Sequence, residues 1–133
     1  MAIAYGTTTG NARLAATFTA AVAGQSVDGG AGFGQLVIGT SSLSGATGVL
    51  VTWTLPKPSV AIASKVATMA GMPLTATPSA NGTAALAEFR DSANNTIISG
   101  ITVGTSGTNI ILATTTLTTS TPVVLTSGTI TSP

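Results

Sequence analysis

The sequence predicts a mainly β protein: an antiparallel β-sandwich, jelly-roll-like in type, with one short N-terminal helix and an extended N-terminal arm. From residue 35 onward, Val, Ile and Thr alternate with polar residues at the period of two that is typical of strands. Gly, Asn, Ser or Pro interrupts this pattern about every 8–12 residues, as in sandwiches and barrels. Only one stretch, near the start, repeats its apolar residues at helical spacing.

The chain begins with MAIAYGTTTG, and residues 1–10 are expected to form the extended arm. Thr and Gly disfavour a helix in this stretch. Ile3 and Tyr5 are the candidate interface anchors of the arm, which we expect to become ordered when it binds a partner.

The next stretch, NARLAATFTAAVAG, predicts a helix over residues 11–24. Asn11 is a suitable N-cap, and Gly24 is a suitable stop. The apolar side chains of this helix recur at every fourth position, at Leu14, Phe18 and Val22. A helix this short must pack against another part of the protein to persist.

Residues 11–133 are expected to form a single domain, because the length of the chain fits one domain. Its many threonines are interpreted as strand surface, since β-branched Thr favours an extended backbone and contacts water without carrying charge. The predicted strands cover residues 35–40, 48–55, 64–70, 72–79, 83–91, 96–104, 109–117 and 122–131.

The strongest hairpin signal is Asn81-Gly82, because both residues tolerate positive φ. Asn94-Asn95 and Ser106-Gly107 are weaker turn signals. Small residues from Ser41 to Gly48 predict a loop, and the glycine-rich stretch DGGAGFG at 28–34 predicts a flexible connector between the helix and the first strand. Three prolines are expected at strand ends or edges, since proline cannot donate to a ladder: Pro56, Pro58 and Pro73.

Charged residues make up 5% of the chain, against about 25% in an ordinary soluble domain. The formal net charge is +1 and the four basic residues are scattered, which argues against nucleic-acid binding. The positive mean hydropathy argues against disorder. No apolar run reaches the roughly 20 residues of a membrane helix, and the start has no signal-peptide pattern. Weak charge repulsion favours association, so we expect a part of an assembly.

The chain contains no Cys and no His. This excludes disulfides, thiol nucleophiles and zinc–thiolate sites, fits an intracellular product, and removes the usual general base. A serine nucleophile would need a lysine base, and no S-x-x-K motif is present. The three acids are too dispersed for a calcium site. The glycines of DGGAGFG precede a strand, whereas a phosphate-binding loop opens a helix. We therefore expect no enzyme and no cofactor.

Glu88, Arg90 and Asp91 form the one local group of charges. On an extended strand Glu88 and Arg90 share a face and lie about 7 Å apart, close enough to pair loosely. Asp91 lies where the strand ends and can accept the backbone N–H bonds that fix a turn. Glu88 and Asp91 would lie on opposite faces, which disfavours an acid/base pair. We interpret the group as a structural strand and turn cluster.

The C-terminal half begins with Gly82-Thr83-Ala84 and leads into a strand that ends in Arg90-Asp91-Ser92. It continues through Val103-Gly104 and Ser106-Gly107 to a final pair of strands rich in Thr and Val. This pattern resembles that of small structural proteins of tailed-bacteriophage virions, and the front of the chain is similar as well, with a short helix near ARLAA and a Gly-rich link into QLVIGT.

The resemblance implies a capsid decoration or cement protein, located on the capsid surface of the virion and assembled in the host cytoplasm. Its implied partner is the major capsid protein, and a homo-oligomer or many separate copies would cover the shell. The β-rich, charge-poor composition agrees with a structural role. Two alternatives stay open: a tail- or fibre-associated adhesin and, less favoured because aromatic residues make up only 4% of the chain, a small carbohydrate-binding module.

Overall fold

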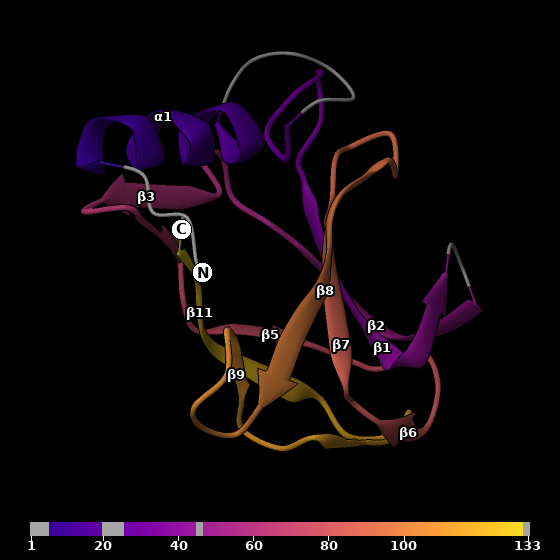
Figure 1. The fold of residues 1–133 in the computed structure, drawn as a ribbon. Helices are drawn as coiled ribbons and strands as arrows, with labels where there is room; N and C mark the ends of the chain where they lie inside the picture. Colours follow the sequence, from indigo (N-terminus) through magenta and orange to yellow (C-terminus); the bar gives the residue numbers. More distant parts are fainter. Residues whose placement is uncertain (1–5, 20–25, 45–46, 132–133) are drawn as a thin grey trace.

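A computed structural model describes residues 6–19, 26–44 and 47–131, and the protein is mainly β with one short helix, as the sequence predicts (Figure 1). The helix is α1 (Thr7–Phe18). The strands are β1 (Gln35–Ser44), β2 (Thr47–Thr54), β3 (Val60–Ala63), β4 (Val66–Met69), β5 (Leu74–Ala76), β6 (Gly82–Thr83), β7 (Leu86–Arg90), β8 (Thr96–Gly104), β9 (Ile110–Leu112), β10 (Thr116–Leu117) and β11 (Val123–Thr131).

Nine of these strands form one curled sheet in the order β2-β1-β7-β8-β9-β11-β4-β3, with β5 paired to β11 beside this path. The strands β6 and β10 form a separate pair. All pairs of named strands are antiparallel except β8 and β9, which pair in parallel at Val103↔Ile110 and Gly104↔Ile111. The predicted antiparallel arrangement thus holds for every described pair but this one, and the sheet is mixed, because the loop over residues 105–109 brings the chain back so that β9 runs in the same direction as β8.

Strand β9 connects the two halves of the sheet, which are β2-β1-β7-β8 on one side and β11-β4-β3 on the other. Asn109, the residue before β9, hydrogen-bonds to both halves. The hydroxyl of Thr102 in β8 donates to Asn109 Oδ1 at 2.9 Å. Asn109 Nδ2 donates to the carbonyl of Thr129 in β11 at 3.1 Å. Because β9 has only three residues, it joins β8 to β11 over a short distance, and the two strands diverge toward α1 (Figure 1).

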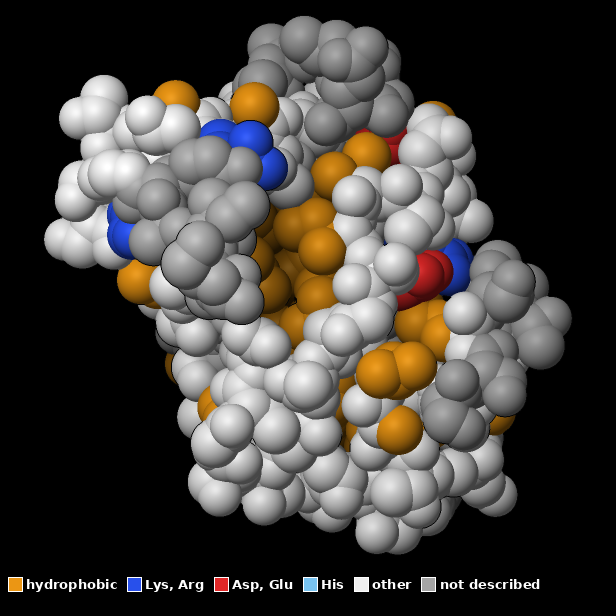
Figure 2. Space-filling model, in the orientation of Figure 1, with side chains coloured by type: hydrophobic (Ala, Val, Ile, Leu, Met, Phe, Trp, Pro, Cys, Tyr) orange, Lys and Arg blue, Asp and Glu red, His pale blue; other side chains and the backbone are white. Residues whose placement is uncertain are grey.

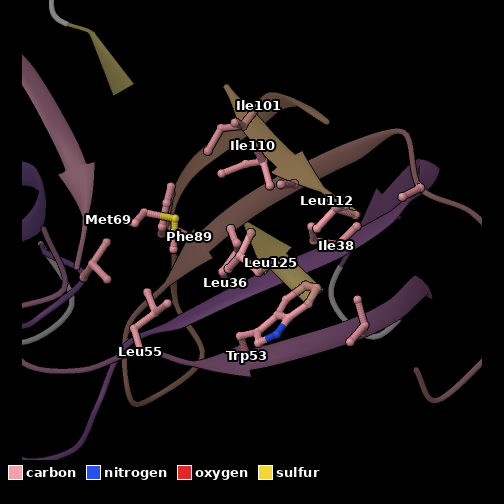
Figure 3. Close-up of a cluster of buried hydrophobic side chains, with 14 of the residues drawn as sticks. Leu36, Ile38, Trp53, Leu55, Met69, Phe89, Ile101, Ile110, Leu112 and Leu125 are labelled. Atoms are coloured by element: carbon pink, nitrogen blue, oxygen red, sulfur yellow. The ribbon is translucent and has the colours of Figure 1, made fainter. Parts of the chain in front are cut away.

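The curl brings the two halves of the sheet face to face in a sandwich-like arrangement, with the hydrophobic core between them (Figure 3). Leu36 and Ile38 of β1 and Trp53 of β2 extend toward Leu112 of β9 and Leu125 of β11. All five side chains are buried. The predicted period of two thus becomes the division between core and outer face.

Helix α1 covers one end of this core with the residues that the sequence places on its apolar stripe. Gly10, Leu14 and Phe18 are its buried residues. The ring of Phe18 meets that of Phe89 in β7 edge to face, with centroids 5.0 Å apart, which is a favourable aromatic geometry. The predicted stripe is confirmed at Leu14 and Phe18, whereas Val22 lies outside the described residues.

The start of α1 differs from the prediction. The helix begins at Thr7 with Gly6 as its N-cap, so residues 7–10 belong to the helix and the predicted arm over residues 1–10 is too long. Tertiary packing outweighs the low helix propensity of this turn. Gly10 lies against the stem of Lys65, and a Cβ at this position would be 2.6 Å from Lys65 Cγ.

The end of α1 also differs from the prediction, which placed the stop at Gly24, outside the described residues. The helix ends at Phe18 because the chain returns along its last turn. The N–H of Val27 donates to the carbonyl of Thr17 at 2.9 Å, and the N–H of Asp28 donates to that of Phe18 at 2.8 Å. These bonds satisfy helix-end carbonyls that would otherwise need a cap.

Asn11 is not the N-cap but a side chain of the second helical turn. Its Oδ1 accepts the backbone N–H of Lys65 at 2.7 Å. Ser64 and Lys65 form the tight turn between β3 and β4, and both have positive φ, 49° and 64°. This conformation is strained for residues other than Gly, Asn and Asp. The predicted strand over residues 64–70 therefore begins too early, and the sequence analysis missed β3.

The Asn81-Gly82 hairpin is also wrong, because the strands on either side of it pair elsewhere. Gly82 belongs to β6 and pairs with Leu117 of β10. Asn81 Oδ1 accepts the N–H of Thr119 at 2.8 Å, so it joins two loops. The weaker signal is confirmed instead, since Asn94 adopts a φ of 69° in the turn between β7 and β8.

The remaining boundaries are mixed. The strand predicted over residues 96–104 coincides with β8, and the three prolines lie between strands, as expected. The predicted loop from Ser41 to Gly48 is too long, because β1 continues to Ser44 and β2 begins at Thr47. Gly107 has the φ of 71° expected of a turn, but this turn joins the parallel strands β8 and β9.

Replacing Asn11 with Ala tests its role as a tether. We expect Asn11→Ala to lower the free energy of unfolding by about 1 kcal/mol, because the N–H of Lys65 loses its acceptor. Without the tether, Asn11→Ala would leave the stability unchanged or raise it, because Ala has the higher helix propensity. An N11A variant as stable as the wild type in chemical denaturation would therefore contradict the tether. Ala12→Ser, on the exposed side of the same turn, is the control.

Candidate functional site

The predicted charge cluster is a buried ion pair on the outer face of the sheet. Arg90 Nε donates to Glu88 Oε1 at 2.8 Å, and Arg90 Nη2 donates to the same oxygen. Arg90 Nη1 donates to Asn94 Oδ1 at 3.3 Å, and the hydroxyl of Thr96 donates to Glu88 Oε1 at 3.4 Å. Glu88 is 6% exposed and Arg90 3%. The pair expected to be loose is therefore held from both sides.

Asp91 fixes the turn that follows β7, as the sequence predicts. Its Oδ1 accepts the backbone N–H groups of Ala93 at 3.0 Å and Asn95 at 2.8 Å. Its Oδ2 accepts the side-chain amide of Asn95 at 3.0 Å. The backbone of Asp91 also donates to the carbonyl of Asn95 and accepts from the N–H of Asn94. The carboxylate thus takes the place of water as the hydrogen-bond acceptor for the N–H groups of this turn.

These contacts give Glu88 and Asp91 different tasks. The carboxylate of Glu88 neutralises Arg90 across the strand, and that of Asp91 organises a turn. A general acid/base pair needs two groups that converge on one reacting atom. Instead, each carboxylate binds groups of its own strand or turn, and the two do not converge on one atom.

The glycine-rich connector DGGAGFG is hydrogen-bonded to the segment between β2 and β3. Buried Asp28 accepts the backbone N–H of Ser59 through Oδ2 at 2.9 Å. Lys57 Nζ donates to the carbonyls of Gly30 and Gly32, both at 3.0 Å. The connector does join the helix to the first strand, but the expectation of a flexible one is wrong, because these long-range bonds fix its course.

The three acids of the chain are all buried, whereas two of its cations are exposed. Asp28 is 5% and Asp91 1% exposed, and Glu88 is paired with Arg90. Arg13 and Lys57 lie at the surface. Within the described ranges, no group of three or more Asp, Glu, His or Cys side chains is placed to hold a metal ion. The charge that the protein presents to its surroundings is therefore mainly positive.

The surface of the described residues has a polar hollow and an apolar hollow. The polar one, of about 330 Å³, sits on the outer face of β1, β2 and β7, and its polar lining is Gln35, Thr52, Ser79, Arg90 and Asn94. The apolar one, of about 430 Å³, lies between α1, β8 and β11. We call the second hollow the seam groove. Figure 2 shows a hollow lined by hydrophobic side chains on this face, with Lys and Arg side chains beside it.

The predicted interface anchors Ile3 and Tyr5 lie outside the described residues. The sequence analysis did not identify the seam groove, which is lined chiefly by Ile97, Ile98 and Ile130. Its one available signal was the pair of adjacent isoleucines in TIISG, since a regular strand would place them on opposite faces.

No protein-family model, curated protein or solved structure matches the chain. No helix in the described part of the chain is long and apolar enough to cross a membrane.

The turn after β7 can be tested at Asp91. We expect Asp91→Ala to lower the free energy of unfolding by about 3 kcal/mol, because three donors lose a charged acceptor at once. The adjacent Ser92→Ala, which keeps the Cβ beside Gly32, should stay within about 0.5 kcal/mol of the wild type. Equal effects of the two substitutions in urea unfolding would show that Asp91 does not organise the turn.

The buried ion pair can be tested by comparing single and double substitutions. Arg90→Met should cost about 3–5 kcal/mol, because it leaves the Glu88 carboxylate buried without its cation. The double variant E88L/R90M removes both charges and should be more stable than R90M alone. A double variant whose loss equals the sum of the two single losses would contradict coupling between these side chains.

Proposed function

We propose that the protein is a structural component of a bacteriophage virion, a capsid decoration or cement protein that binds the outer surface of the major capsid protein shell. It would be present in many copies and would stabilise the head. Its activity is binding, and the site of that activity is its surface.

The observation that carries the proposal is how the charges and threonines are distributed. The acids hold a strand, a turn and a connector, as the contacts of Glu88, Asp91 and Asp28 describe. The exposed strand positions carry uncharged, β-branched side chains, among them Thr52, Thr54, Thr68, Thr75, Thr102 and Thr126. A stiff, charge-poor β surface loses little side-chain entropy on contact and meets little repulsion from neighbouring copies.

The mechanical effect follows from repetition. A standard interface buries about 1,600 Å² in total. Each bound copy adds its binding free energy to the folded, assembled state of the shell, because binding stabilises whichever state it prefers. A modest affinity is sufficient when the same contact is repeated over a whole shell.

The proposal is tested by adding the purified chain to heads of its phage that lack it. We expect saturable co-sedimentation with the heads and a higher temperature of DNA release. Deleting residues 1–5, which removes Ile3 and Tyr5 but leaves α1 whole, should weaken binding several-fold without lowering the melting temperature of the free chain. Failure of the full chain to bind heads would overturn the proposal, and full binding by the deletion variant would overturn the role of the arm.

A second candidate, a tail- or fibre-associated adhesin, is favoured by the polar hollow beside Arg90. Amide, hydroxyl and guanidinium groups line it, and such groups bind the hydroxyls of sugars. Electron microscopy of virions with a labelled copy separates the candidates by position, because a label on the tail excludes a decoration protein. Asn94→Ala should abolish any glycan binding by this hollow.

A further inference from the structure

The seam groove exists because β8 and β11 are not joined by any described strand between β9 and α1. Strand β8 pairs with β9 only at Val103 and Gly104, and β9 in turn pairs with β11. From Thr96 to Thr102, no strand in the described ranges pairs with β8 on the side away from β7. The backbone of this part of β8 is therefore an open strand edge, interrupted at Gly100, whose φ is 70°. Open edges accept further strands.

A bulge in β8 turns two adjacent isoleucines into the lining of the groove. Phe89 pairs with Ile98 while the next residue, Arg90, pairs with Thr96, so Ile97 is an extra residue in the ladder. Bulges redirect side chains in this way. Ile97 and Ile98 are half-buried, and with Ile130 of β11 they leave apolar surface open to an incoming side chain.

The charge beside the groove is positive. Arg13 of α1 lines the groove and is exposed. A second copy of the chain has no exposed side-chain carboxylate to offer, because all three acids are buried at 6% exposure or less. Charge complementarity therefore selects a different chain, one that carries Asp or Glu.

We infer that the seam groove binds an extended, apolar segment of a partner protein that carries a carboxylate next to its apolar residues. The segment pairs through its backbone with the open edge of β8 over residues 97–99, because the positive φ of Gly100 interrupts the extended backbone after Ser99. Its apolar side chains contact Ile97, Ile98 and Ile130, and its carboxylate faces Arg13. This is strand addition with side-chain pockets for specificity. The inference deepens the proposed function, on which it rests for the partner being a shell protein.

The probe is a short fluorescein-labelled peptide in which Val and Ile alternate with Thr and Glu, and binding to the full chain is read by fluorescence anisotropy. Two control peptides, which we call its twins, accompany it. One has Lys in place of Glu, and the other has Pro at a central position and so cannot pair as a strand. We expect the acidic peptide to bind and both twins to bind at least about tenfold more weakly.

Two pairs of variants locate the site. Arg13→Glu should weaken binding of the acidic peptide about tenfold, whereas Lys57→Glu, the same charge change at another exposed cation, should change it less than about twofold. Ala16→Trp, which fills the groove from α1, should abolish binding, whereas Ala12→Trp, exposed on α1 and outside the groove, should not. Thermal melts confirm that each variant is folded.

Equal losses in R13E and K57E would reduce the effect to general attraction and overturn the inference, as would unimpaired binding by A16W or by the Pro twin. Tighter binding of decanoate than of the peptide, blocked by A16W, would also overturn it in favour of an amphiphile site. A dimer of the free chain that A16W dissolves would make a second copy the occupant.

Binding to heads separates this inference from the proposed function. If the wild type decorates heads and A16W does so equally well, the groove is not the docking site and the proposed function stands. If the wild type binds the acidic peptide but no heads, the groove stands and the proposed function fails.

Discussion

The length of strand β9 is the constraint on which the rest of the structure depends. With three residues it joins the two halves of the curled sheet near one end, and the halves diverge toward the other. The open end has to be covered, because the core beneath it is apolar. Helix α1 covers it by placing Phe18 against Phe89. The tether from Asn11 to Lys65 and the returning segment at Val27 then fix the helix in position.

The buried charges impose a second constraint. A buried carboxylate is tolerated only when cations or N–H groups surround it. Glu88 has Arg90 and Asp91 has the amides of its turn. Asp28 departs from this rule in part, because its Oδ2 accepts the N–H of Ser59 while its buried Oδ1 has no hydrogen-bond partner among the described residues. Since the acids are used in this way, the polar groups that face the solvent are mainly threonine hydroxyls and a few cations. The result is a surface with few charges, and the exposed charges of Arg13 and Lys57 are positive.

The seam connects stability with the proposed function. A sheet that ends before it is closed leaves unpaired backbone and isoleucine side chains at one place, and both are satisfied when another strand enters. Binding there would complete the sheet that folding leaves open, and it would stabilise the bound protein by mass action. If the protein is the proposed decoration protein, such a site would add the free energy of strand pairing to each contact with the shell.

Local chemistry in the sequence determined the β class, the bounds of β8, the apolar stripe at Leu14 and Phe18, and the turn at Asp91, since each depends on residues within a few positions of one another. Tertiary structure alone decided that Asn11 binds Lys65, that Asn81 binds Thr119 instead of making a hairpin, and that β9 runs parallel to β8. It also decided where the groove lies, because Arg13, Ile98 and Ile130 are far apart in the chain. Periodicity states which face of a strand is apolar, but the strand that it meets is chosen by packing the whole chain at once.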